Sequence, residues 1–273
     1  MRQETAVVLG PGGLLGTAWL AGLVAGLRRE RFDLAQADLI IGTSAGAIVG
    51  AALAAGQDLE RLAVLPESDG EPGVKADPER LGEVFAILGD SSLEPAAALS
   101  RIGRLALAAE TGAEEAHLAR MEFLIGGREW PEGRLLIPAV DVETGEPLVW
   151  ERASGVSLVA AVASSCAFPG SAPPITINGR RYMDGALRSG TNTDLAAGIQ
   201  TVIVIEPLAH LFPGNTPPDA TAVRLVPDLA AQKALGDLND RAAWSSVYQA
   251  GVRQAPEAAK LIEPVRVGRR ATG

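Results

Sequence analysis

The residues best able to do chemistry lie in Gly42-Thr43-Ser44-Ala45-Gly46, which follows the apolar run Leu39-Ile40-Ile41 and precedes an apolar segment at 47–53. This order predicts a buried strand, a sharp turn with Ser44 at its apex, and a helix, the arrangement of a nucleophile elbow. Gly42 and Gly46 let the backbone turn sharply. The N–H of Ala45 would lie at a helix N-terminus, where unpaired amides favour an oxyanion. We therefore predict a serine nucleophile at Ser44.

A second glycine cluster, Gly10-Pro11-Gly12-Gly13-Leu14-Leu15-Gly16, separates a predicted strand at 5–9 from a predicted helix at 14–28. Its spacing approaches a dinucleotide-binding fingerprint, but that fold also needs an acidic residue at the end of its second strand. Here the second strand ends in Gly42-Thr43-Ser44, which disfavours a dinucleotide. Glycine amides at a helix start can instead form an oxyanion hole. A glycine-rich turn without a ligand is the alternative.

A serine nucleophile needs a base, and the chain has only two histidines, His117 and His210. The order Ser44, Asp184, His210 matches an α/β-hydrolase triad, but that fold normally places several strands before its nucleophile, and here only one precedes the elbow strand. His117 lies in a charged helical stretch, and we expect it to face solvent. Asp184, at the end of a predicted strand and before Gly185, could accept the Ser44 proton directly if burial raises its pKa. A turn-capping role for Asp184 and a His210-dependent triad both stay open.

The elements that must position these residues alternate between strand and helix at the N-terminus, which predicts a parallel sheet sandwiched by helices. We expect a single domain over 1–273 with a helical insertion or lid at 57–130 and a C-terminal helical segment at 228–263. The predicted strands and helices lie at 5–9, 14–28, 38–41, 45–54, 78–88, 95–108, 113–125, 135–140, 148–150, 157–165, 175–183 (a hairpin turning at Asn178-Gly179), 201–205 and 222–226.

The composition of the chain argues against several classes of function. The net charge of −9 argues against a nucleic-acid partner. Cys166 is the only cysteine, so neither an intrachain disulfide nor a Cys-based zinc site can form, and we expect it to be a packed thiol. No clustered ligand set is visible, so we predict no metal and no cofactor. No segment reaches the ~18 uninterrupted apolar residues of a membrane span, which favours a cytoplasmic protein.

Four blocks together resemble the patatin-like phospholipases, over roughly residues 5–206 with a poor match in the insertion. They are Gly12-Gly13-Leu14-Leu15-Gly16, Gly42-Thr43-Ser44-Ala45-Gly46-Ala47, the segment from Ala163 to Pro174, and Tyr182-Met183-Asp184-Gly185-Ala186. The resemblance implies a three-layer α/β/α fold with a mainly parallel central sheet. It also implies a lipid acyl hydrolase of serine esterase or phospholipase A type. Its Ser–Asp dyad would be Ser44 and Asp184, and its oxyanion hole the Gly12, Gly13 and Leu14 amides, joined by that of Ala45. The expected partner is a lipid or fatty-acyl ester, with transient membrane-surface contact.

The chain departs from the family pattern at three places. Pro11 replaces the first glycine of the loop, and Leu15 replaces a basic residue; if that cation holds a phosphate head group, neutral esters become more plausible substrates. Asn192-Thr193-Asp194 stands where the family continues toward an N-x-P segment. Two rival functions remain, an acyltransferase with the same dyad and a non-catalytic lipid- or acyl-binding protein. The sequence leaves oligomeric state and calcium dependence open.

Overall fold

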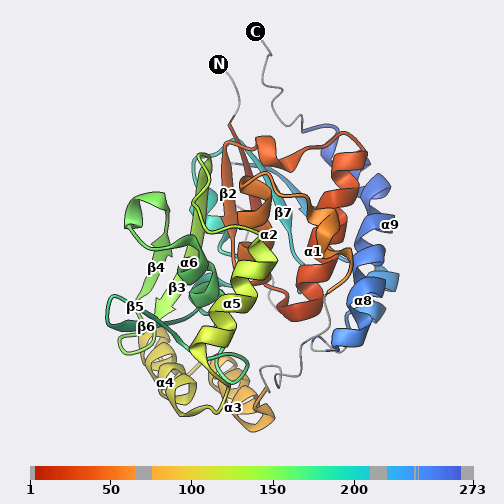
Figure 1. The fold of residues 1–273 in the computed structure, drawn as a ribbon. Coiled ribbons are helices and arrows are strands. Elements are labelled where there is room, and N and C mark those ends of the chain that lie inside the picture. Colours follow the sequence, from red (N-terminus) through yellow and green to blue (C-terminus); the bar gives the residue numbers. More distant parts are fainter. Residues whose placement is uncertain (1–3, 66–75, 210–219, 237, 239, 266–273) are drawn as a thin grey trace.

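A twisted sheet forms the centre of the molecule (Figure 1). The computed structural model describes residues 4–65, 76–209, 220–236, 238 and 240–265. Within these ranges eight strands join in one sheet of order β5-β6-β3-β2-β1-β7-β8, with β4 pairing with β3 outside this order. The strands are β1 Thr5–Leu9, β2 Leu39–Gly42, β3 Arg134–Asp141, β4 Pro147–Trp150, β5 Ile175–Ile177, β6 Arg180–Asp184, β7 Thr201–Ile205 and β8 Thr221–Leu225.

The middle of the sheet is parallel and one side is antiparallel. β1 pairs in parallel with β2 and β7, β2 pairs in parallel with β3, and β7 pairs in parallel with β8. β4 and β6 pair antiparallel with β3, and β5 pairs antiparallel with β6. Parallel strands are buried on both faces, and in β1 both Val7 and Val8 are fully buried. The prediction of a mainly parallel sheet is confirmed.

Helices from distant parts of the chain cover the first face of the sheet. They are α1 Gly13–Arg29, α2 Ala45–Ala54, α5 Glu114–Ile125, α6 Leu158–Ser165 and α9 Trp244–Ile262, and the short α8 Leu229–Ala234 adjoins α9. α1 and α9 lie side by side (Figure 1). Their backbones approach so closely that a Cβ at Gly22 would lie 2.0 Å from the carbonyl oxygen of Tyr248. The many small residues of the sequence therefore serve tight helix packing.

The second face carries two helices of the expected insertion, a short third helix and one turn. α3 Pro78–Leu88 and α4 Pro95–Ala108 pack over Val140 of β3 and Met183 of β6, together with the short α7 Ala186–Ser189. The turn Thr193–Ala196 packs over the β1, β2 and β7 part of the same face. Helices thus lie on both faces, as expected for a three-layer α/β/α fold. Residues 66–75 of the expected insertion lie outside the described residues.

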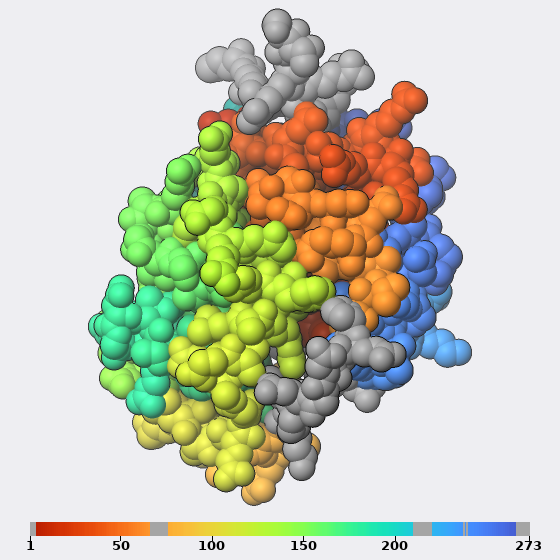
Figure 2. Space-filling view, in the orientation of Figure 1, coloured from red at the N-terminus to blue at the C-terminus, as the bar shows by residue number. Residues whose placement is uncertain are grey.

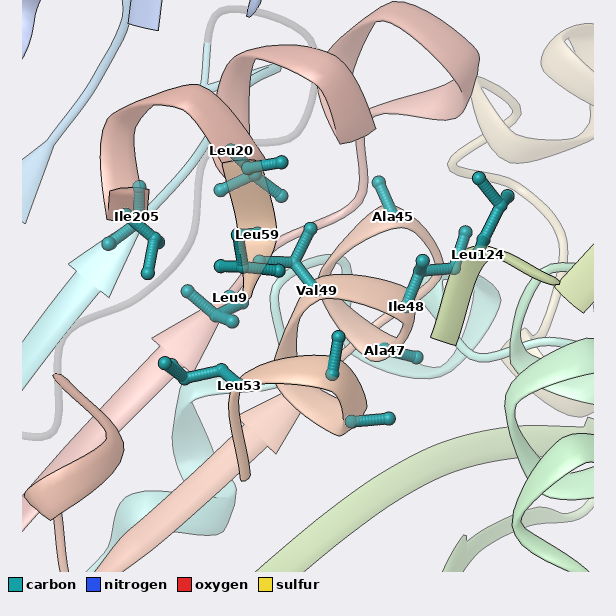
Figure 3. Close-up of a cluster of buried hydrophobic side chains, with 14 of the residues drawn as sticks. Leu9, Leu20, Ala45, Ala47, Ile48, Val49, Leu53, Leu59, Leu124 and Ile205 are labelled. Carbon is teal, nitrogen blue, oxygen red and sulfur yellow. The ribbon is translucent and has the colours of Figure 1, made fainter. Parts of the chain in front are cut away.

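Helix α2 is buried within the main hydrophobic core. Leu9 of β1, Ile205 of β7, Leu20 of α1 and Leu59 gather around Val49 (Figure 3). Every residue of α2 before its last, Ala54, is buried. Such close packing holds the position of the turn that precedes the helix.

In the space-filling view, α5 and residues 55–65 meet in front of the sheet (Figure 2). Arg61 joins them, because its Nη1 donates a hydrogen bond of 2.9 Å to the carbonyl oxygen of Phe123. Burial lowers the pKa of this guanidinium, against the effect of nearby Asp58. The strand ends that lead into the loops with Ser44 and Asp184 lie outside this cover. They are near α3 and α4, at the lower end of the view in Figure 1.

Candidate active site

Ser44 occupies the strained turn that the sequence predicts between β2 and α2. Its backbone angles are φ 54° and ψ −117°, a conformation that a residue with a side chain rarely adopts. The turn is tight because α2 crosses close over β1 and β2. A Cβ at Gly42 would lie 2.4 Å from the carbonyl oxygen of Gly46, and one at Gly46 would lie 2.0 Å from that of Leu9. Only glycine fits at either position.

Asp184 lies at the end of β6, and the structure brings it to Ser44. β6 pairs with β3, which in turn pairs with the elbow strand β2. The Asp184 side chain is 1% exposed. Its Oδ1 accepts a hydrogen bond of 2.8 Å from the backbone N–H of Ala186, and the Ser44 side chain lies close enough to lower the pKa of the carboxyl group. Two residues about 140 positions apart in the sequence therefore lie close together in the fold.

Burial sets the acidity of this carboxyl group. It raises the pKa of Asp184 from its ordinary value of 3.8 to about 7, although the hydrogen bonds from Ala186 and Ser44 act in the opposite direction. A general base works best with a pKa near the operating pH. The sequence predicts Asp184 as a base only if burial raises its pKa, and burial does raise it.

The end of α6 holds the backbones of both residues. The Ser165 Oγ accepts a hydrogen bond of 3.1 Å from the N–H of Ser44, and the Cys166 thiol donates one of 3.2 Å to the Ser44 carbonyl oxygen. The carbonyl oxygen of Ala167 accepts one of 3.0 Å from the N–H of Asp184. Three consecutive residues thus fix the strained elbow against the end of β6.

Sequence reasoning missed these contacts. The signal available was a small polar cluster, Ser164-Ser165-Cys166, at the end of an apolar helix. Cys166 is partly buried, and its pKa is raised well above the ordinary value by burial and then by the nearby Asp184. A protonated thiol can donate to the Ser44 carbonyl. Its prediction as a packed thiol was therefore incomplete.

The glycine loop lies beside the elbow because β1 and β2 are neighbours in register, with Leu9 opposite Gly42. α1 begins at Gly13 and α2 at Ala45, so two helix N-termini follow adjacent strand ends. Partial positive charge collects at such ends. In the part of the chain that the structure describes, no acceptor pairs with the amides predicted as oxyanion donors, those of Gly12, Gly13, Leu14 and Ala45.

Two further loop positions serve structure. The N–H of Gly16 donates to the carbonyl oxygen of Gly12 at 2.9 Å, which closes the first turn of α1. Leu15, where the resembling family carries a basic residue, is fully buried in the core. The loop itself therefore adds amide dipoles to this region and no cationic side chain.

The structure corrects the prediction for His117. His117 was expected to face solvent, and this prediction was wrong: the side chain is 4% exposed, because it shares an inward helix face with Met121 and Leu124. Its Nε2 lies 3.1 Å from the carbonyl oxygen of Ala163, and burial lowers its pKa from 6.5 to about 4. His210 lies outside the described residues.

Among the described residues, no three His, Cys, Asp or Glu side chains gather where they could hold a metal ion. No helix in that part of the chain combines the length and apolar character needed to cross a membrane.

Comparisons with known proteins agree with the motifs. A family model described as patatin-like phospholipase matches residues 7–197. The structure of VipD from Legionella pneumophila aligns with 95% of this chain at 12% identity and a TM-score of 0.47. That of the type III effector protein ExoU aligns with 96% at 17% identity and a TM-score of 0.41. This chain covers 67% of the length of the first structure and 53% of the second.

Proposed function

Because the chain belongs to the patatin-like phospholipase family, we propose that it cleaves carboxylic esters of lipids with Ser44 as nucleophile and Asp184 as base. The family resemblance read from the motifs is confirmed, and membership supports lipid hydrolase activity. One observation carries the finer assignment: a serine on a strained turn lies beside a buried carboxyl group whose pKa burial raises to about 7.

In the proposed reaction, the Ser44 oxygen attacks the acyl carbonyl carbon as its proton passes to the Asp184 carboxylate. The N–H groups of Gly12, Gly13, Leu14 and Ala45 stabilise the tetrahedral oxyanion. Collapse of this intermediate breaks the ester bond, and the leaving alcohol takes the proton from Asp184. The acyl group then remains bonded to the Ser44 oxygen.

Water completes the cycle. It gives a proton to Asp184 as its oxygen attacks the acyl-enzyme carbonyl, and the same amides stabilise the second oxyanion. When the bond to Ser44 breaks, the serine oxygen recovers the proton and the fatty acid leaves. These steps use only the chain's own residues and water.

For the substrate we propose a fatty-acyl ester of a neutral lipid. Leu15 is buried and apolar where the resembling family has a cation, so this loop offers no side chain to bind a phosphate. A transient contact between α3 and a lipid surface is part of this proposal. Phe85 and Leu88 of α3 are both exposed, and the Phe85 ring lies 5.8 Å from that of Phe168, close after the α6 turn that holds Ser44.

A fluorophosphonate probe tests the proposed nucleophile. We expect one adduct, mapped to Ser44 by peptide mass, that is lost in Ser44→Ala and Asp184→Asn. Asp141→Asn is the matched control, because Asp141 is an equally buried aspartate on β3 that pairs with Arg180. A folded protein without an adduct at Ser44 would favour a binding protein. Loss of the adduct in His210→Ala would restore the histidine-dependent triad.

Product analysis then separates the remaining functions. The purified protein is offered a triacylglycerol emulsion, phosphatidylcholine vesicles and a short soluble ester, each with and without an added alcohol acceptor. Free fatty acid as the main product supports hydrolysis, and a new ester of the acceptor indicates an acyltransferase. Preference for the phosphatidylcholine vesicles would contradict the assignment to neutral lipids.

A further inference from the structure

Asn192 is a fully buried asparagine between the two turns that carry Ser44 and Asp184. Its Nδ2 lies 3.0 Å from the Thr43 Oγ1, 3.0 Å from the carbonyl oxygen of Gly185 and 3.1 Å from that of Gly190. Thr43 directly precedes Ser44, and Gly185 directly follows Asp184. One amide group thus connects the neighbours of both residues.

The orientation of this amide is fixed by its oxygen. Arg188 donates from Nη1 to the Asn192 Oδ1 at 2.8 Å, and the same guanidinium forms an ion pair with Asp194 at 2.6 Å. A guanidinium only donates, so the amide oxygen must face it and the NH₂ must face Thr43 and Gly185. This pairing excludes the flipped orientation, in which the oxygen and the nitrogen of the Asn192 amide exchange places.

The backbone of Asn192 is also specialised. Its φ of 58° and ψ of 36° lie in the left-handed region, which asparagine and aspartate adopt more readily than other side chains. This conformation places the residue between the short helix α7 and the turn Thr193–Ala196. Both the residue type and its geometry suit a link between the two turns.

We propose that Asn192 is a positioning residue, whose amide ties Thr43 to Gly185 and thereby sets the Ser44 hydroxyl against the Asp184 carboxylate. The inference rests on the proposed function. The α6 turn holds the main chains of Ser44 and Asp184, and Asn192 holds their neighbours. A displacement of about 1 Å between reacting groups can lower a rate about 100-fold, so a link of this kind acts on the chemical step more than on substrate affinity.

Asn192→Asp is the first variant for the test. It keeps the side-chain shape, the left-handed backbone and an oxygen for Arg188, but it places an acceptor where the carbonyl oxygens of Gly185 and Gly190 need a donor. With a short soluble ester we expect kcat to fall about 100-fold while KM changes less than about threefold. Asn178→Asp is the matched control: Asn178 is also left-handed, with φ 52°, but exposed in the β5–β6 hairpin, and its kcat should not change.

Substitutions of Thr43 give a second test of the positioning role, and they add no charge. Thr43→Val removes the hydroxyl acceptor and should lower kcat about 10-fold, whereas Thr43→Ser keeps the hydroxyl and should recover most of that loss. If both residues act through one bond, Asn192→Asp combined with Thr43→Val should lower kcat no further than the larger single effect. Circular dichroism establishes folding, and if Asn192→Asp does not fold, the Thr43 pair decides.

The outcomes separate this inference from the proposed function. A parent protein without an adduct at Ser44 overturns both. A labelled and active parent, with folded Asn192→Asp and Thr43→Val variants at unchanged kcat, overturns the positioning role alone. Equal losses in Thr43→Val and Thr43→Ser, or a change confined to KM, also count against it.

Discussion

Replacing Asp184 by Asn should remove the reaction and stabilise the fold at alkaline pH. The carboxyl group is 1% exposed, and burial raises its pKa from 3.8 to about 7. Between these values the folded protein holds a proton that the unfolded chain has released. The free energy of unfolding therefore falls as the pH rises from about 4 to about 7, and it stays low above that range.

The magnitude follows from the same two values. One pKa unit corresponds to about 1.4 kcal/mol, so the ionised carboxylate costs the fold about 4 kcal/mol above neutral pH. Roughly 3 kcal/mol of this develops between about pH 5 and pH 8.5. The amide of the Asp184→Asn variant can still accept the N–H of Ala186 through its oxygen, and it carries no charge at any of these pH values.

Urea unfolding followed by tryptophan fluorescence at about pH 5 and pH 8.5 measures the effect. We expect the stability advantage of Asp184→Asn over the parent to grow by about 3 kcal/mol between the two conditions. Asp141→Asn should instead be less stable than the parent by a similar amount at both pH values, because Asp141 is ionised throughout this range. Burial raises the pKa of Asp141, but hydrogen bonds from Thr144, Arg180 and Glu143 outweigh this and lower it, so its charge stabilises the fold.

Two results would refute this reasoning. One is a parent as stable as Asp184→Asn at about pH 8.5. The other is a stability difference that is the same at both pH values. Either would mean that ionisation of the Asp184 carboxyl group does not destabilise the fold, and that burial does not raise its pKa.

Three other outcomes are expected. Because the proposed base, Asp184, can accept a proton only when it is ionised, kcat/KM should rise with pH through a midpoint near 7, and a flat profile from about pH 5 to 8 contradicts this. Ser165→Ala loses the acceptor of the Ser44 N–H, worth about 1 kcal/mol, so fluorophosphonate labelling should slow about 5-fold. Ser157→Ala, which removes only the N-cap of α6, should leave the labelling rate unchanged. Burial lowers the pKa of His117 from 6.5 to about 4, so the parent should lose about 3 kcal/mol as the pH falls through this range, a loss absent from His117→Gln in urea unfolding.

Local signals predicted much of the fold and the site. The apolar runs at 5–9 and 201–205 became β1 and β7 with the expected bounds. The glycines at 42 and 46 marked the elbow because a tight strand-to-helix crossing leaves room for no other residue. Asp184 was recognisable because a strand ending in Asp-Gly gives its carboxyl group a fixed place at the sheet edge. Each of these signals lies within a few consecutive residues.

The long-range contacts of the site could not be predicted from the sequence. Ser165 and Cys166 contact Ser44 across about 120 positions, and Asn192 contacts Thr43 across about 150. No local pattern encodes such distances, because they arise only when separate strands join one sheet. His117 is different: with Met121 and Leu124 it follows a four- and three-residue spacing that indicates an inward helix face. The surrounding charges concealed that spacing.

The order of the strands also sets when the protein can become reactive during its synthesis. Ser44 leaves the ribosome early, but Asp184 and the Asn192 link follow only after about 150 more residues. At typical translation rates of about 5–20 residues per second, the nascent chain has the proposed nucleophile without the proposed base for roughly 8–30 s. Until β6 pairs with β3, the growing chain therefore lacks the carboxylate that is proposed to activate Ser44.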